Sequence, residues 1–203
     1  MKLYYTHNLN PRVAVAVAKY LASPVDYIKS QPRHPAHEDA FRPINPNTLC
    51  PVLVEKTRSL WETDAISCRL SAIAKSDFWR NGDEQAEMIM WISWGTHHLT
   101  RGANPAYFDR VVRPTFSNKP GDPAAIEEGL RDFHKYAGIL DSILARKDWL
   151  VGTRISYADF RVATALPFAE GARLPLAEFQ NVKKWHDRLL DIEAWRDPFQ
   201  GLA

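Results

Sequence analysis

The chain has 203 residues, of which 45% are hydrophobic and 25% charged, as in an ordinary globular protein. Lys and Arg number 26 against 24 Asp and Glu, and a net charge of +2 argues against nucleic acid or an anionic membrane as the main partner, because both favour a clustered basic surplus. Two cysteines, no apolar leader and no run of about 18 apolar residues predict a cytoplasmic protein with neither a disulfide framework nor a membrane span.

Residues 1–76 predict a mixed α/β domain in the order β-α-β, loop, β-β-α. Asn10 is expected to cap the first helix, with Pro11 in the first helical position and Pro24 just beyond the end of the helix. The strands are expected at 2–5, 25–29, 51–54 and 58–61, the loop at 31–50, and the helices at 10–21 and 63–74.

Residues 77–83 interrupt the hydrophobic periodicity and predict a linker, so residues 84–203 form a second, all-helical domain. The 84–102 segment carries an apolar stripe at helical spacing, and a second face holds Met90, Trp94, His97 and Arg101. The helices of this domain are expected at 84–102, 124–145, 157–170 and 178–192.

Three segments carry a family resemblance. The first is Asn-Pro-Asn-Thr-Leu-Cys-Pro-Val-Leu at 45–53, the second Trp-Glu-Thr-Asp-Ala-Ile at 61–66, and the third Gly-Thr-Arg-Ile-Ser-Tyr-Ala-Asp at 152–159. In the third, Ser156 and Asp159 have the spacing of a helix capping box, which indicates a structural role. In this order and at this spacing, the three segments resemble the cytosolic glutathione S-transferase superfamily over essentially the whole chain.

The resemblance implies a thioredoxin-like N-terminal domain that binds glutathione and a helical domain that shapes the pocket for an electrophile. It implies a cis proline at Pro51, whose preceding residue, Cys50, offers its backbone to the extended tripeptide. Glu62 would pair with the glutathione ammonium and Thr63 would receive its α-carboxylate. His37 lies near a basic position that contacts the glycyl carboxylate in some members. The simpler alternatives are a trans Pro51 and solvated Glu62 and His37, with Thr63 an N-cap only and Cys50 a small buried hydrophobe.

The thiol-activating position departs from the family. The run Asn10-Pro11-Arg12 resembles the start of the first helix in serine-type bacterial members, and this alignment places Asn8 where the activating serine stands. At a pKa near 8.5, about 3% of a thiol is ionised at pH 7, so a donor that favours the thiolate matters. Asn8 is the first candidate donor, and Thr6, Tyr5 and Asn10 are possible substitutes. The alternative is that Asn8 and Asn10 are only turn and cap residues.

The expected function is conjugation of glutathione, as co-substrate, to a small hydrophobic electrophile by a cytoplasmic homodimer without a metal. Trp94, His97 and Arg101 would line the electrophile pocket, or pack between the domains instead. Because residue 8 is neither Ser, Cys nor Tyr, a non-catalytic module for binding or assembly is the main rival. Glutathione-dependent disulfide chemistry requires a cysteine at the start of the first helix, and residues 6–12 contain none.

Overall fold

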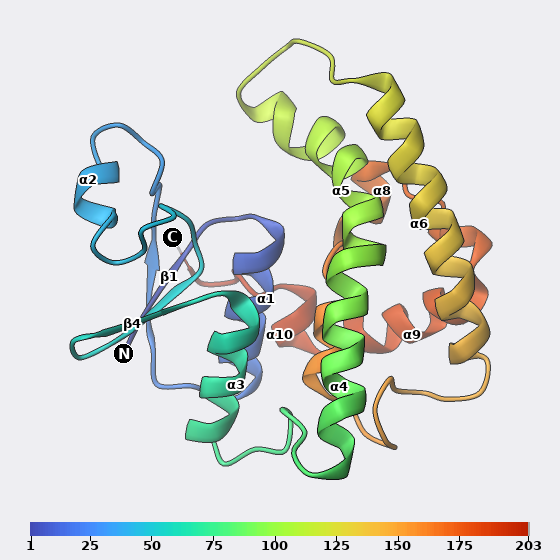
Figure 1. Cartoon of the computed structure of the whole chain (residues 1–203), viewed down its shortest axis with the longest axis horizontal. Coiled ribbons are helices and arrows are strands. Elements are labelled where there is room, and N and C mark those ends of the chain that lie inside the picture. Colours follow the sequence, from blue (N-terminus) through green and yellow to red (C-terminus); the bar gives the residue numbers. More distant parts are fainter. Residues whose placement is uncertain (203) are drawn as a thin grey trace. The chain divides into compact units, whose positions relative to one another are not determined.

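The computed structural model, described for residues 1–202, consists of two compact units (Figure 1). Unit 1 comprises Met1–Trp79 together with the C-terminal segment from Ile192 onward, and unit 2 comprises Arg80–Asp191. The sequence predicted that the last segment belongs to the helical domain. In the structure it groups with unit 1 instead, because Trp195 is fully buried there beside the first helix, against Arg12.

Unit 1 is built on a four-stranded sheet of order β2-β1-β3-β4, in which β1 and β2 are parallel and β3 is antiparallel to both of its neighbours. This is the predicted thioredoxin-like arrangement, and every predicted strand is confirmed within one or two residues. The elements are β1 (Lys2–Tyr5), α1 (Leu9–Tyr20), β2 (Asp26–Lys29), α2 (Glu38–Phe41), β3 (Val52–Glu55), β4 (Arg58–Trp61), α3 (Thr63–Ile73) and α10 (Glu193–Arg196).

Helix α1 forms the core of unit 1. Its residues 13–18 alternate Val and Ala and are all fully buried, which confirms a helix that is apolar all round. The predicted N-cap is wrong by two residues: Asn8 is the N-cap, with extended backbone angles, while Asn10 and Pro11 lie inside the first turn. Proline fits there because the first N–H groups of a helix have no partner within the helix.

Unit 2 is helical, as predicted, but π-helical segments and 3₁₀ turns divide some of the helices that were expected to be continuous. The elements are α4 (Asp83–Trp94), a π-helical segment (Gly95–Thr100), α5 (Arg101–Tyr107), a second π-helical segment (Phe108–Val112), α6 (Pro123–Leu144), α7 (Tyr157–Val162), α8 (Ala169–Ala172) and α9 (Gln180–Leu190), with 3₁₀ turns at Arg113–Thr115, Leu166–Phe168 and Leu176–Glu178. The predicted helix at 157–170 is two short helices, because Ala163 ends α7 and a 3₁₀ turn precedes α8.

The crossing of α5 and α6 depends on two glycines. A Cβ on Gly102 would lie 2.7 Å from the backbone N of Phe133, and one on Gly129 would lie 2.7 Å from the carbonyl oxygen of Gly102. Both distances are shorter than real Cβ contacts, so larger residues at these positions would force the helices apart.

The capping box predicted at the start of α7 is present. The buried Asp159 carboxylate accepts the Ser156 N–H at 2.8 Å and the Ser156 hydroxyl at 3.1 Å, and it also accepts the Leu150 N–H and the Trp185 indole N–H at 3.0 Å. Burial raises the pKa of Asp159, and these four donors act against that shift. Asp159 therefore joins three segments of unit 2 around one buried carboxylate.

Within residues 1–202, no helix is long and apolar enough to cross a membrane.

Candidate functional site

Three of the segments predicted to hold a ligand meet at one edge of the sheet in unit 1. The strand register places Tyr4 opposite Val52, and Val52 opposite Trp61. The end of β1, the start of β3 and the end of β4 therefore lie side by side. The residues just beyond them are Thr6 to Asn8, Cys50 with Pro51, and Glu62 with Thr63.

The first of these segments is the loop into α1. Asn8 is exposed, its carbonyl accepts the Arg12 N–H at 2.9 Å, and its side-chain amide makes a long 3.4 Å hydrogen bond to the Thr6 hydroxyl. The first turn of α1 contains no acidic residue, so the partial positive charge of the helix N-terminus is not neutralised from within the turn. An anion beside Asn8 would be stabilised by this helix end.

The second segment contains the Cys50–Pro51 peptide bond, which is cis, as the resemblance implied. The buried Asn45 shapes the loop before it, because its side chain donates to the Leu49 carbonyl at 2.8 Å and accepts the Asn47 N–H at 3.0 Å. Burial raises the pKa of the Cys50 thiol to about 12, so the thiol is neutral at physiological pH. The Cys50 sulfur is therefore not a reactive thiolate at that pH.

The third segment begins α3. Glu62 is its exposed N-cap and has φ 74° and ψ 127°, a conformation that non-glycine residues rarely adopt. Thr63 is buried, and its hydroxyl donates to the Asn10 carbonyl at 3.1 Å, tying the N-termini of α1 and α3 together. Because the Thr63 hydroxyl proton already bonds to Asn10, a ligand carboxylate beside Thr63 would have to accept hydrogen bonds from the backbone N–H groups in the first turn of α3.

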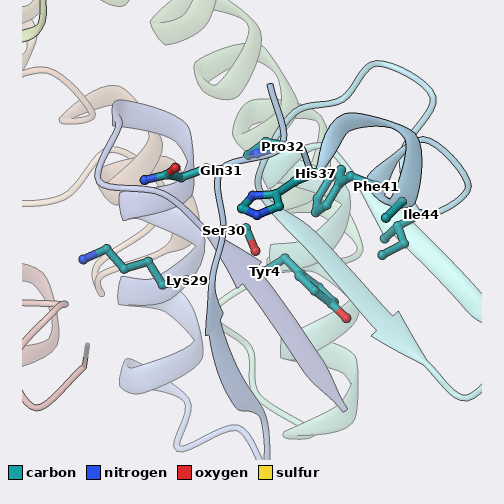
Figure 2. A pocket seen from close by; sticks show the side chains of 9 residues that line it. Tyr4, Lys29, Ser30, Gln31, Pro32, His37, Phe41 and Ile44 are labelled. Atoms are coloured by element: carbon teal, nitrogen blue, oxygen red, sulfur yellow. The ribbon is translucent and has the colours of Figure 1, made fainter. Parts of the chain in front are cut away.

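His37 lies in a cleft of about 600 Å³ beside the same sheet edge (Figure 2). Tyr4 comes from β1, Lys29 from the end of β2, and His37 and Phe41 from the segment around α2. Tyr4 and Phe41 meet edge to face, with ring centroids 5.8 Å apart. Lys29 was not among the site residues expected from the sequence; the parallel pairing of Lys29 with Tyr5 brings it to this edge.

The three predicted electrophile-pocket residues of unit 2 have different immediate neighbours. Trp94 packs edge to face on Tyr136 of α6, with centroids 6.1 Å apart, whereas Arg101 lines a cleft of about 380 Å³ between α5 and α6. His97 is exposed on the π-helical segment that separates them. A π-helix bonds residue i to i+5, so Trp94 and Arg101 are joined by a segment that does not have regular α-helical hydrogen bonding.

Among residues 1–202, no group of three or more His, Cys, Asp or Glu side chains is arranged to hold a metal ion. The groups that the sheet brings together are the N-terminus of α1, the backbone beside the cis Pro51 and the Glu62 carboxylate. Such groups suit a short peptide that carries both an ammonium and an anionic group.

Comparison with known proteins agrees with this architecture. Residues 104–193 match the family described as "Glutathione S-transferase, C-terminal domain". A probable glutathione S-transferase GSTF2 of Oryza sativa subsp. japonica is 28% identical over 200 residues, covering 94% of this chain and 91% of the relative. FtsZ-localized protein A of Caulobacter vibrioides is 27% identical, covering 87% and 83%.

Among solved structures, human glutathione S-transferase T1-1 in its apo form superposes with a TM-score of 0.85 at 26% identity, covering 98% of this chain and 86% of that one. The matches extend over both units of the chain. In its sheet order, its capped helical unit and these matches, the chain is similar to glutathione S-transferases over both units.

Proposed function

We propose that this protein is a glutathione transferase that joins the glutathione sulfur to a small hydrophobic electrophile. The observation that carries the proposal is the sheet register, which brings the N-terminus of α1, the cis Cys50–Pro51 bond and Glu62 to a single edge. Relatives named glutathione S-transferases span most of the chain and support the same activity.

Each part of the tripeptide has a partner at this edge. The Glu62 carboxylate would pair with the γ-glutamyl ammonium, and the first-turn N–H groups of α3, beginning at Thr63, would receive its α-carboxylate. The backbone of Cys50, just before Pro51, would bind the extended cysteinyl unit. His37, in its cleft beside α2, would meet the glycyl carboxylate.

The sulfur would lie at the N-terminus of α1, where Asn8 donates from its side-chain amide and Thr6 and Asn10 are the neighbouring candidates. The thiol loses its proton to solvent, and the thiolate attacks an electrophilic carbon, forming a C–S bond as a leaving group departs with its electron pair. Lowering the thiol pKa by two units from about 8.5 would raise the ionised fraction at pH 7 from about 3% to about 75%. This is the contribution required of Asn8 and the helix end.

The second substrate would be held by unit 2. We assign Trp94, His97 and Arg101 as candidates, with Trp94 the strongest because its ring belongs to an aromatic cluster with Tyr136 and His98. We also propose that the protein acts as a cytoplasmic homodimer in detoxification.

The test is glutathione calorimetry followed by a conjugation assay with an activated aryl halide, in which released chloride and the new thioether absorbance are both measured. Saturable turnover at the rate of an enzyme is expected. Glutathione binding without turnover would instead support the non-catalytic alternative. No glutathione binding would overturn the proposal.

A further inference from the structure

The C-terminal segment of unit 1 contacts the loop that precedes α1. The Phe199 ring lies 4.3 Å from the His7 ring, centroid to centroid, and 5.6 Å from the Tyr5 ring, to which it is nearly parallel at 19°. The rings of Tyr5 and His7 are also stacked, 5.9 Å apart. Three rings from the end of β1, the loop and the C-terminal segment therefore form one cluster, which we call the Phe199 stack.

Two cations of α1 hold the segment that carries Phe199. The Arg12 guanidinium lies 4.7 Å from the centre of the Trp195 ring and donates to the Trp195 carbonyl. The Lys19 ammonium donates to the Gln200 carbonyl at 2.6 Å. Burial lowers the pKa of Arg12 to about 10, with Asp197 acting in the opposite direction, so Arg12 remains a cation at pH 7. Phe199 is thus presented by a segment fixed on both sides of it.

The loop itself has few anchors. His7 and Asn8 are exposed, and the side-chain amide of Asn8 reaches only as far as Thr6, in the same loop. Desolvation and the Lys29 charge lower the pKa of His7, so its ring is neutral at pH 7 and stacks as an uncharged aromatic. The contact between His7 and Phe199 fixes the residue immediately before Asn8 to a segment far away in sequence.

We propose that Phe199 is a positioning residue for thiol activation: through His7 it fixes the backbone of the Thr6–Asn8 loop and so directs Asn8 toward the sulfur. This inference rests on the proposed function. Phe199 touches neither glutathione nor the electrophile in this scheme, so its removal should affect turnover and thiol ionisation more than glutathione affinity. Glu62 and the N-terminus of α3 lie in other segments and retain their part of the binding energy.

The experiment compares Phe199→Ala and Phe199→Leu with Phe199→Tyr. Loss of one aromatic contact should lower kcat by about threefold to tenfold in the Ala and Leu variants, with the glutathione Kd changing less than about twofold. The thiolate absorbance of bound glutathione should titrate at a higher pH, closer to that of free glutathione. Phe199→Tyr, which keeps the ring, should restore the parent values. The Leu variant retains most of the side-chain volume, which covers the case in which the Ala variant fails to fold.

The matched control is Phe78→Leu, because the Phe78 ring packs 4.7 Å from Tyr20 at the opposite end of α1. This variant should lose stability yet keep the parent kcat and thiol titration. An equal loss of kcat in Phe78→Leu, or unchanged kcat and thiol titration in Phe199→Leu, would overturn the positioning role.

A second readout needs no glutathione. In the parent protein the His7 imidazole signals should titrate below the usual histidine range, and in Phe199→Ala they should move up toward it. An unchanged His7 titration overturns this inference even if the parent is an active transferase. A shifted His7 titration in a parent that never ionises the glutathione thiol overturns the proposed function instead.

Discussion

Substitutions at Glu62 can distinguish an effect on stability from an effect on glutathione binding. The backbone of Glu62 is strained, whereas its side chain is proposed to contact the ligand. A non-glycine residue at φ 74° and ψ 127° costs about 1–3 kcal/mol, which glycine does not incur. Glycine in turn loses about 0.4–1 kcal/mol through the greater freedom of the unfolded chain. Glu62→Gly should therefore stabilise the protein by about 0.5–2 kcal/mol, and Glu62→Ala, which keeps the strain, should leave stability nearly unchanged.

The two variants should behave alike toward glutathione. Each removes the carboxylate that would pair with the ammonium, and a charge-assisted contact is worth about 1.5–3 kcal/mol, or roughly tenfold to a hundredfold in Kd. Isothermal titration calorimetry measures the affinity, and thermal unfolding measures stability, with an expected rise in Tm of about 1–8 °C for Glu62→Gly alone.

The outcomes discriminate between the two effects. Unchanged affinity in both variants would refute the assignment of the carboxylate to the glutathione ammonium. A lower Tm for Glu62→Gly than for Glu62→Ala would refute the claim that the backbone is strained at this position. Glu62→Gln, which keeps the hydrogen-bonding geometry and removes the charge, should lie between parent and Glu62→Ala in affinity.

Four further predictions concern the sulfur, the core, the buried thiol and the assembly. Asn8→Ala should lower kcat by about tenfold to a hundredfold with a smaller change in glutathione Kd, and Asn8→Ser should retain or raise activity. Thr6→Val and Asn10→Ala are the comparison variants. A larger loss of kcat in either of them would assign the donor role to that residue instead of Asn8. Asp159→Ala should destabilise the protein by about 3–5 kcal/mol in chemical unfolding, because it leaves buried donors unpaired, and a loss below about 1 kcal/mol would contradict the buried network. Since the pKa of Cys50 is raised to about 12, its alkylation in the native protein at pH 8 should be on the order of a thousandfold slower than that of a free thiol and should accelerate tenfold per pH unit, which peptide mass spectrometry can follow; rapid labelling at pH 7 would refute its burial. Sedimentation at micromolar concentration should give a dimer, and a monomer would contradict the proposed assembly.

Much of the fold was predictable because its signals are local. Strand propensity, the buried Val-Ala run of α1 and the Ser156–Asp159 box each depend on a few neighbouring residues. The predicted helix cap at Asn10 was wrong because both Asn8 and Asn10 have cap chemistry, and only the tertiary position of the chain selects Asn8.

Features that depend on distant segments were not predictable. The π-helical segment at Gly95–Thr100 interrupts the regular α-helix, and its first residue packs closely against another segment: a Cβ on Gly95 would lie 2.9 Å from the Val162 side chain. The hydrogen bond between Thr63 and Asn10 likewise joins residues whose pairing exists only after the sheet has formed. The same holds for the ring of Phe199 beside His7.

The return of the C-terminal segment to unit 1 has a consequence for biosynthesis (Figure 1). Residues 1–79 leave the ribosome before the segment from Ile192 onward, so the place of Trp195 over Arg12 stays empty until that segment emerges. Until then the guanidinium and the apolar surface around it face water or a chaperone. Unit 1 is therefore completed only after unit 2 has been synthesised, and a nascent chain truncated before Ile192 would carry the proposed glutathione-binding edge on an unfinished core.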